Sequence, residues 1–375
     1  MTEKVTICLI GPSRGGKSSL LASWTECAVQ GAHGYPKRLG ISVREIDEAE
    51  FAGAGGPAKP WILGATGGEY SRLRRTFLSS DQWEATPTED TYEYFFRLDR
   101  QVEGNGGGGK SSNVLVQIVD AAGELSAAES GDDAASAKQV LEKFDDQIRQ
   151  AEAIVAVVPL IEFSNAGWAD TLRNVLLNLI ENPGDKLQRF VVAFSQYERL
   201  FVRFGSTAFR LAVLPQVARM VTRSFLDRAD WLGSLRKFEI ANRGVDVRLT
   251  VTSAYGFVKG HGNPNIDPHR KGEHRFGSDQ ARGHLVARNL WRPFLTADPF
   301  LYAALGEDGQ YTFSFKQLDE ASVPVRPDPR SGRARQAAKP RTDVGISPPP
   351  RGEPEPNKSP AIWERLGRWT KDYFE

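Results

Sequence analysis

Cysteine is almost absent from the chain, with only Cys8 and Cys27 among 375 residues. Two cysteines cannot form the framework of several disulfides that stabilises small secreted domains. Cys8 lies in an apolar run and Cys27 in a stretch of helical composition. Both are therefore expected to be small buried residues in a reducing compartment.

Long apolar runs and an excess of one charge sign are also lacking. No stretch is long and apolar enough to span a bilayer, and residues 1–6 lack the basic segment and apolar core of a signal peptide. With 48 basic and 47 acidic residues the net charge is +1, which gives no general reason to expect nucleic acid or an anionic membrane as a partner. We expect a cytoplasmic protein.

Short apolar runs alternate with segments of helical composition along most of the chain. This alternation predicts an α/β layered fold with a mostly parallel sheet. The expected strands are 5–10, 92–98, 114–119, 153–160, 190–194 and 247–251. The expected helices are 18–29, 68–80, 138–152, 168–180, 209–225 and one that begins within 280–290. Strands 92–98 and 114–119, joined by a glycine run, are expected to form an antiparallel hairpin.

Composition divides the chain into three parts. Residues 1–320 are expected to form the α/β domain, with an insertion at about 30–82 that is irregular over 31–60. Residues 321–358 are rich in proline and arginine and poor in large apolar residues, which predicts a disordered linker. Residues 359–375 recover helical spacing, which predicts an amphipathic helix.

The C-terminal helix carries an apolar side that includes Trp363, Leu366 and Trp369. It follows a linker without a core of its own, so it could bind a partner, its own domain or a membrane. Its charges nearly cancel, which argues against anionic lipid. We therefore favour a protein partner that binds this helix in a groove.

Residues 11–18, GPSRGGKS, fit the phosphate-binding pattern G-x-x-x-x-G-K-[ST]. The motif follows an apolar strand and opens a helix, which is the setting that the pattern requires. Lys17 would contact the β- and γ-phosphates, and the Ser18 hydroxyl would bind Mg²⁺. The residues expected to surround the phosphates are Ser13, Arg14, Gly15, Gly16, Lys17, Ser18 and Ser19.

A second motif, DAAGE, follows the strand at 114–119. Asp120 could hold a water of the Mg²⁺ shell, and Gly123 could present its N–H to the γ-phosphate. The D-x-x-G pattern alone is common, because acidic residues often end strands. It gains weight from its place after a phosphate loop and a second strand.

A phosphate loop followed by D-x-x-G after a hairpin resembles the Ras-like GTPases of the translation-factor-related (TRAFAC) class. The resemblance covers about residues 1–300 and is closest to a bacterial branch found in conflict or defence gene clusters. It implies a P-loop three-layer sandwich that binds GTP and Mg²⁺. It also implies a switch threonine that binds Mg²⁺ near 83–88, either Thr86, which we favour, or Thr88.

The resemblance is weaker where the base would bind. The family places N/T-K-x-D after the fifth strand, and this chain has SQYE at 195–198. Glu198 could accept two hydrogen bonds from guanine, with Gln196 in place of the missing lysine. Ser253 and Ala254 match the family's S-A-K loop. Glu198 as a solvated surface acid, and ATP or relaxed base specificity, remain alternatives.

The position that orients the attacking water in the family is Glu124 rather than glutamine. A glutamate there could act as a base or could repel the γ-phosphate. We expect slow hydrolysis that an arginine from a partner or a second protomer could accelerate. The favoured function is a GTP-dependent switch acting on a protein partner in a bacterial multi-protein system. The alternative is a catalytically weak nucleotide-bound structural module. Oligomeric state stays open.

Overall fold

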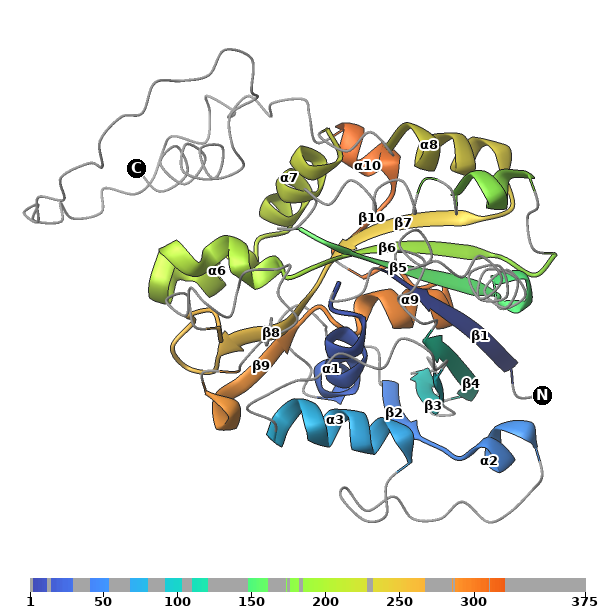
Figure 1. The fold of residues 1–375 in the computed structure, drawn as a ribbon, viewed down its shortest axis with the longest axis horizontal. Coiled ribbons are helices and arrows are strands. Elements are labelled where there is room, and N and C mark those ends of the chain that lie inside the picture. Colours follow the sequence, from blue (N-terminus) through green and yellow to red (C-terminus); the bar gives the residue numbers. More distant parts are fainter. Residues whose placement is uncertain are drawn as a thin grey trace, which may run out of the picture.

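The computed structural model describes residues 3–11, 15–29, 41–53, 68–79, 92–102, 110–120, 148–160, 173, 176–181, 185–227, 232–266, 285, 287–309 and 311–320. In this part of the chain, eight strands form one sheet and two further strands form a separate antiparallel pair (Figure 1). Helices cover both faces of the large sheet, which confirms the α/β fold expected from the sequence.

The large sheet has the strand order β10-β7-β6-β5-β1-β4-β3-β2. Its central strands β7, β6, β5, β1 and β4 are parallel. Antiparallel pairs lie toward both edges: β3 with β4 and β2 with β3 at one edge, and β10 with β7 at the other. The single antiparallel strand expected from the sequence, β3, is therefore joined by one other, β10. The strands are β1 (Glu3–Ile10), β2 (Ile41–Glu45), β3 (Tyr92–Val102), β4 (Lys110–Asp120), β5 (Ala153–Pro159), β6 (Arg189–Ser195), β7 (Asp246–Val251) and β10 (Thr312–Phe313).

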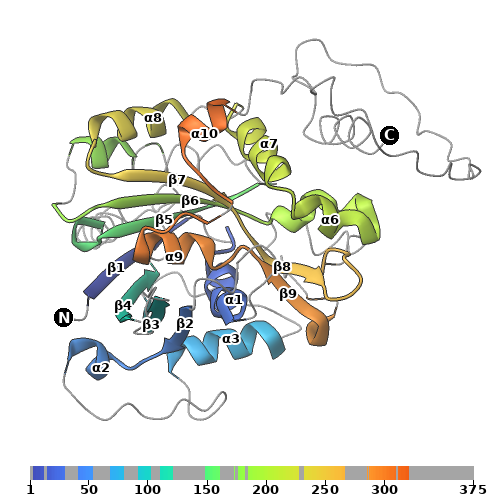
Figure 2. The same ribbon diagram turned by 180° about the vertical axis from the view of Figure 1, so that it is seen from behind.

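Side chains of β1 alternate between two hydrophobic cores, as expected for a central strand covered on both faces. Val5, Ile7 and Leu9 pack into one core, and Cys8 and Ile10 into the other. Helices α1 (Lys17–Val29), α3 (Glu69–Ser79) and α9 (Asp298–Leu305) lie on the first face, and α7 (Pro215–Leu226), α8 (Leu232–Ala241) and α10 (Phe315–Glu320) on the second (Figures 1 and 2).

Helix α1 is held by apolar residues that recur every three or four positions. Leu20, Leu21, Trp24 and Cys27 are all buried in the first core. The Trp24 ring lies 4.8 Å from that of Phe96 and 5.2 Å from that of Phe300. The helix that follows the phosphate loop is therefore fixed against both β3 and α9.

Residues 31–60 are not irregular throughout, as the sequence had led us to expect. The part at 41–53 forms β2, which pairs with β3, and the short helix α2 (Glu48–Ala52). The Asp47 side chain accepts a hydrogen bond from the Glu50 amide, which caps α2. Val43 faces the core, so this strand extends the sheet beyond the hairpin.

Two helix predictions need correction. The helix expected over 209–225 is divided into α6 (Ala208–Ala212) and α7, because Pro215 cannot continue a helix and instead occupies the first turn of a new one. The helix expected within 280–290 is absent from its described residues, which include only the short 3-10 helix η4 (Arg288–Leu290). The chain instead continues into β9 (Trp291–Phe294).

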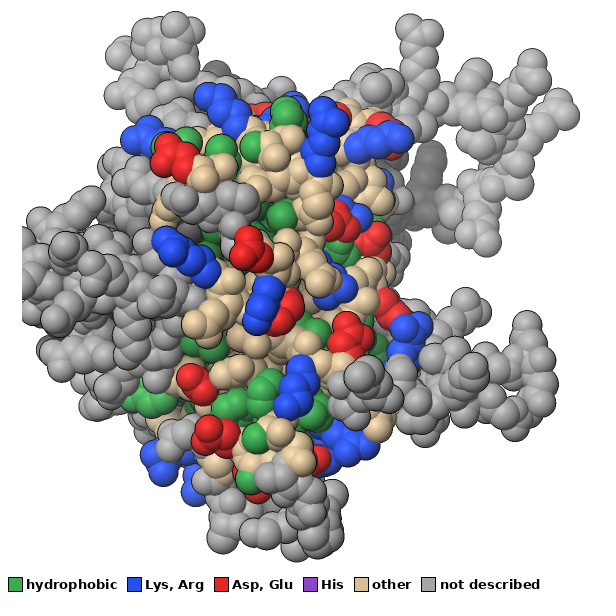
Figure 3. Space-filling model, turned by 90° about the vertical axis from the view of Figure 1, so that its right-hand side faces the viewer, with side chains coloured by type: hydrophobic (Ala, Val, Ile, Leu, Met, Phe, Trp, Pro, Cys, Tyr) green, Lys and Arg blue, Asp and Glu red, His purple; other side chains and the backbone are tan. Residues whose placement is uncertain are grey.

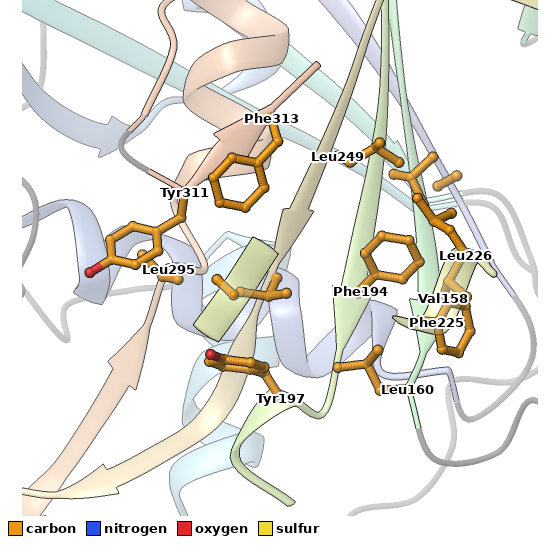
Figure 4. Close-up of a cluster of buried hydrophobic side chains, with 14 of the residues drawn as sticks. Val158, Leu160, Phe194, Tyr197, Phe225, Leu226, Leu249, Leu295, Tyr311 and Phe313 are labelled. Atoms are coloured by element: carbon orange, nitrogen blue, oxygen red, sulfur yellow. The ribbon is translucent and has the colours of Figure 1, made fainter. Parts of the chain in front are cut away.

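Beside the carboxyl end of the sheet, β9 pairs with β8 (Ser253–Val258). The 3-10 helix η3 (Tyr197–Thr207) packs against this pair through aromatic rings. Tyr197 lies 4.8 Å from Phe201 and 6.4 Å from Phe294, measured between ring centroids. Figure 4 shows Tyr197 beyond the end of the strand that carries Phe194. The segment after β6 is thus anchored in the core.

Both cysteines are buried and free, as expected from the sequence. Acidic and basic side chains are interspersed over the face drawn in Figure 3, in keeping with the near-neutral net charge. Among the helices that the structure describes, none combines the length and apolar character needed to cross a bilayer.

Candidate nucleotide-binding site

The loop between β1 and α1 begins and ends at glycines that no other residue could replace easily. A side chain on Gly11 would place its Cβ 2.8 Å from the Val157 carbonyl oxygen of β5. Gly16 has φ +91°, in the region that favours glycine. Glycine is therefore required at position 11 because β5 lies close to the loop, and at position 16 because the backbone is left-handed there.

Lys17, the first residue of α1, points back toward the start of the loop. Its Nζ donates a 2.9 Å hydrogen bond to the Gly11 carbonyl oxygen, and the side chain is buried. Burial lowers the pKa of Lys17, and the nearby Asp120 carboxylate partly opposes this. An ammonium group held at the mouth of a glycine loop is suited to phosphate oxygens.

Asp120 ends β4 beside Leu9 of β1, because the two strands are parallel and in register. Its side chain is buried, and no described residue forms a hydrogen bond with its Oδ1 atom. Burial raises the pKa of this carboxyl to about 6, although the charge of Lys17 lowers it. An unpartnered buried carboxylate oxygen requires a donor or a cation to offset its desolvation.

Ser18 and Asp120 fit a Mg²⁺ site of the kind that uses few protein ligands. Mg²⁺ prefers oxygen ligands and keeps several waters, so one hydroxyl and one carboxylate suffice when phosphates supply the rest. Ser18 lies in the first turn of α1, next to Lys17. No group of three or more His, Cys, Asp or Glu side chains with the geometry of a metal site occurs among the described residues.

Ser195 contributes a contact that the sequence reasoning did not assign. Its hydroxyl, at the end of β6, donates a 2.7 Å hydrogen bond to the Gly15 carbonyl oxygen. Ser195 is buried and occupies the first position of the SQYE segment, where the family has asparagine or threonine. That position was the signal that could have identified it.

Glu198 is not a surface acid, which overturns that alternative. Its side chain is fully buried, and neither carboxylate oxygen has a hydrogen-bond partner among the described residues. Burial raises its pKa to about 7, and the Ser253 hydroxyl, the backbone amide of Tyr255 and the charge of Arg199 act in the opposite direction. Glu198 and Ser253 therefore lie side by side, and their part in binding a base stays a prediction.

Three further predicted residues line this region. Gln196 is half-buried, has φ 64°, and accepts a 2.8 Å hydrogen bond through Oε1 from Nη1 of Arg199. The carbonyl oxygen of Ala254 accepts a 2.9 Å hydrogen bond from the Trp291 indole. Ser19 is buried beside Tyr255. Burial raises the pKa of Tyr255, and the hydrogen bond with the Ser19 hydroxyl partly opposes this.

The remaining predicted residues lie outside the described part of the chain. These are Ser13, Arg14, Thr86 with its alternative Thr88, Gly123, Glu124, and Trp363, Leu366 and Trp369 of the C-terminal segment. Residues 321–375, which include the expected linker, lie outside it as well.

Comparisons with known proteins find little. No family model matches the chain, and no curated protein matches it. Among solved structures 126 chains match. One is described as a crystal structure of sup35 complexed with GDP, and its sequence is 13% identical to this chain. The match covers 68% of this chain and 38% of the sup35 chain, with a TM-score of 0.29. This chain thus spans well under half of that protein. A likeness this distant carries no argument about function.

Proposed function

We propose that this protein is a GTP-binding molecular switch that hydrolyses GTP slowly with Mg²⁺. The observation that carries the proposal is the position of Lys17, Asp120 and Glu198 at the same edge of the sheet. Lys17 follows β1, Asp120 ends β4 and Glu198 follows β6. These strands are parallel, so their carboxyl ends lie at the same edge of the sheet. The strand order β3-β4-β1-β5-β6-β7, with β3 antiparallel, supports a Ras-like arrangement of this edge.

At the phosphates, the loop's amides and the start of α1 would bind the negative oxygens. Lys17 would exchange its hydrogen bond to Gly11 for one to a β- or γ-phosphate oxygen. Ser18 and a water held by the unpartnered oxygen of Asp120 would bind Mg²⁺. The metal supplies charge neutralisation between the β- and γ-phosphates when bound.

At the base, Glu198 would accept hydrogen bonds from the ring N–H and the amino group of guanine. Its two oxygens have no other partner among the described residues, so guanine would satisfy a carboxylate that is otherwise costly to bury. Adenine presents no such pair of donors at the corresponding edge. Recognition by Glu198 would therefore favour GTP over ATP.

The switch itself rests on residues outside the described part. Thr86 and Gly123 would bind around Mg²⁺ and the γ-phosphate and release after hydrolysis. Glu124 in the water-orienting position supports slow intrinsic turnover. The proposal includes a protein partner that binds residues 359–375 or the switch segments, in a bacterial conflict or defence system. This part is supported only by the resemblance and by the amphipathic pattern of residues 359–375.

A second candidate, a nucleotide-bound structural module, is favoured by the departures at Glu124 and in the SQYE segment. Multiple-turnover phosphate release with Mg-GTP separates the two. The switch predicts release on the order of 10⁻⁴ to 10⁻² s⁻¹, abolished in Lys17→Ala and retained in Lys316→Ala, whose side chain is exposed on α10. GTP binding without any release would favour the module.

A further inference from the structure

Gln196 has a backbone conformation that glutamine rarely adopts. Its φ of 64° and ψ of 30° are left-handed, and only one other described residue that is not glycine, Leu295, has a positive φ. Such a conformation costs of order 1 kcal/mol and persists only where the surroundings impose it. A strained residue between Ser195 and the buried Glu198 points to a function for its side chain.

The chain is fixed on both sides of Gln196. Before it, Ser195 is bonded to Gly15 of the phosphate loop. After it, the Tyr197 amide donates a 3.1 Å hydrogen bond to the Thr252 carbonyl oxygen. The backbone of Gln196 is therefore held between the phosphate loop and the loop after β7. This fixed backbone sets the direction of the Gln196 side chain.

The Gln196 side chain binds Arg199. Its Oε1 accepts a hydrogen bond from Nη1 of Arg199 at 2.8 Å, and the Arg199 amide donates to the Gln196 carbonyl oxygen at 3.1 Å. Both residues are half-buried. Two bonds between the same residues limit the positions available to the guanidinium, which is planar and stacks well on flat rings.

The Arg199 guanidinium lies near the other groups of the base pocket. Its charge favours the ionised forms of both Glu198 and Tyr255, against the larger effect of burial on their pKa values. Glu198 and Ser253 are fully buried and lie close enough to interact, but within the described part of the chain no hydrogen bond of good geometry reaches their side-chain oxygens. A cation thus lies beside a buried carboxylate.

We propose that Arg199, held in place by Gln196, is the surface on which the purine base lies while Glu198 binds the base edge. The inference rests on the proposed function. Arg199 takes the place that the missing lysine leaves vacant, with a flat cation in place of an alkyl stem. Gln196 acts through Arg199 and is a positioning residue.

The test compares binding of Mg-GTP with binding of Mg-tripolyphosphate, which has no base, by calorimetry on the full chain. Arg199→Met keeps an apolar stem and removes the cation, and it should weaken GTP binding roughly tenfold while leaving tripolyphosphate binding unchanged. Arg203→Met, an exposed arginine of the same 3-10 helix, is the matched control and should bind both like the wild type.

Gln196 is tested by two substitutions. Asparagine tolerates the left-handed backbone but is too short to reach Arg199, so Gln196→Asn should weaken GTP binding severalfold. Gln196→Glu can still accept the hydrogen bond and should retain GTP binding. A purely structural role for Gln196 would not distinguish these two variants in this way.

Two results would overturn the inference. Unchanged GTP binding by Arg199→Met would show that the base does not lie on Arg199, and an equal loss of tripolyphosphate binding would place Arg199 at the phosphates. Absence of GTP binding by the wild type would instead overturn the proposed function. Far-UV circular dichroism of each variant recognises unfolding separately, so that an equal loss of both ligands is interpreted only for a folded variant.

Discussion

The Ser195 hydroxyl donates a 2.7 Å hydrogen bond to the Gly15 carbonyl oxygen, joining two segments 180 residues apart. One segment belongs to the phosphate loop and the other precedes Glu198. The bond is buried, so neither group has water as an alternative partner. The two segments to which we assign phosphate binding and base binding are thereby connected through one hydroxyl group.

Removal of this hydroxyl should weaken binding of the whole nucleotide. Ser195→Ala leaves the buried Gly15 carbonyl oxygen without this donor, at a cost of about 1–3 kcal/mol. We expect weaker binding of both Mg-GTP and Mg-tripolyphosphate, measured by calorimetry, with Ser206→Ala on the exposed end of η3 as the control. Loss of GTP binding alone would mean that Ser195 acts on the base and not on the loop.

Glu198→Gln should change the preferred base. A carboxamide can donate one hydrogen bond, and xanthine carries a carbonyl oxygen where guanine carries its amino group. The variant should bind XTP more tightly than GTP, and the wild type should bind GTP more tightly than XTP. In each protein the two binding free energies should differ by about 1–3 kcal/mol. An unchanged order in the variant would show that Glu198 does not contact the base.

Asp120→Asn should remove the contribution of Mg²⁺ to nucleotide affinity. A neutral amide is a poor partner for a water of the Mg²⁺ shell, and loss of such an outer contact costs roughly 10- to 100-fold in metal affinity. In titrations with Mg²⁺ present the variant should bind GTP as the wild type does in EDTA. A variant that keeps the full Mg²⁺ effect would contradict this role.

Asp298 makes stability depend on pH. It is buried at the start of α9, and neither of its carboxylate oxygens has a hydrogen-bond partner within the described residues. Burial raises the pKa of this carboxyl well above its ordinary value. The folded state therefore holds this proton more strongly than the unfolded state. The resulting stability is present at acid pH and is lost as pH rises from about 4 toward the raised pKa.

Asp298→Asn should abolish this loss, so its stability relative to the wild type should rise from pH 5 to pH 8. The expected gain at pH 8 is roughly 1–3 kcal/mol, the range for a buried polar group without a partner. Nearby Cys27 and Tyr311, with pKa values raised to about 11 and about 12, stay neutral in this range. Urea unfolding at both pH values measures the effect, and a constant difference would contradict it.

Local patterns in the sequence were sufficient to predict the central strands of the sheet and the positions of Lys17 and Asp120 after neighbouring strands. The apolar strands, the glycine loop and Asp120 each carry their information within a few residues. The extra strand at 41–45 was missed because its glycine-rich surroundings hide a short run whose only core residue is Val43. The break before α7 could have been predicted from Pro215.

The relationships between distant segments could not be predicted in the same way. The Ser195 bond to Gly15, and the burial of Glu198 against Ser253, depend on which strand ends meet, and one chain alone does not specify that. The left-handed turn at Gln196 is equally hidden, because glutamine is a poor indicator of that conformation. Its cause lies in the fixed chain on both sides.

Calorimetric titration of the purified chain with Mg-GTP and Mg-ATP tests the central claim most directly. The account predicts saturable binding of one GTP per chain, weaker binding of ATP by at least tenfold, and loss of GTP binding in Lys17→Ala but not in Lys316→Ala. Equal binding of both nucleotides would contradict base recognition by Glu198. Absence of binding, or full binding by Lys17→Ala, would contradict the nucleotide site itself.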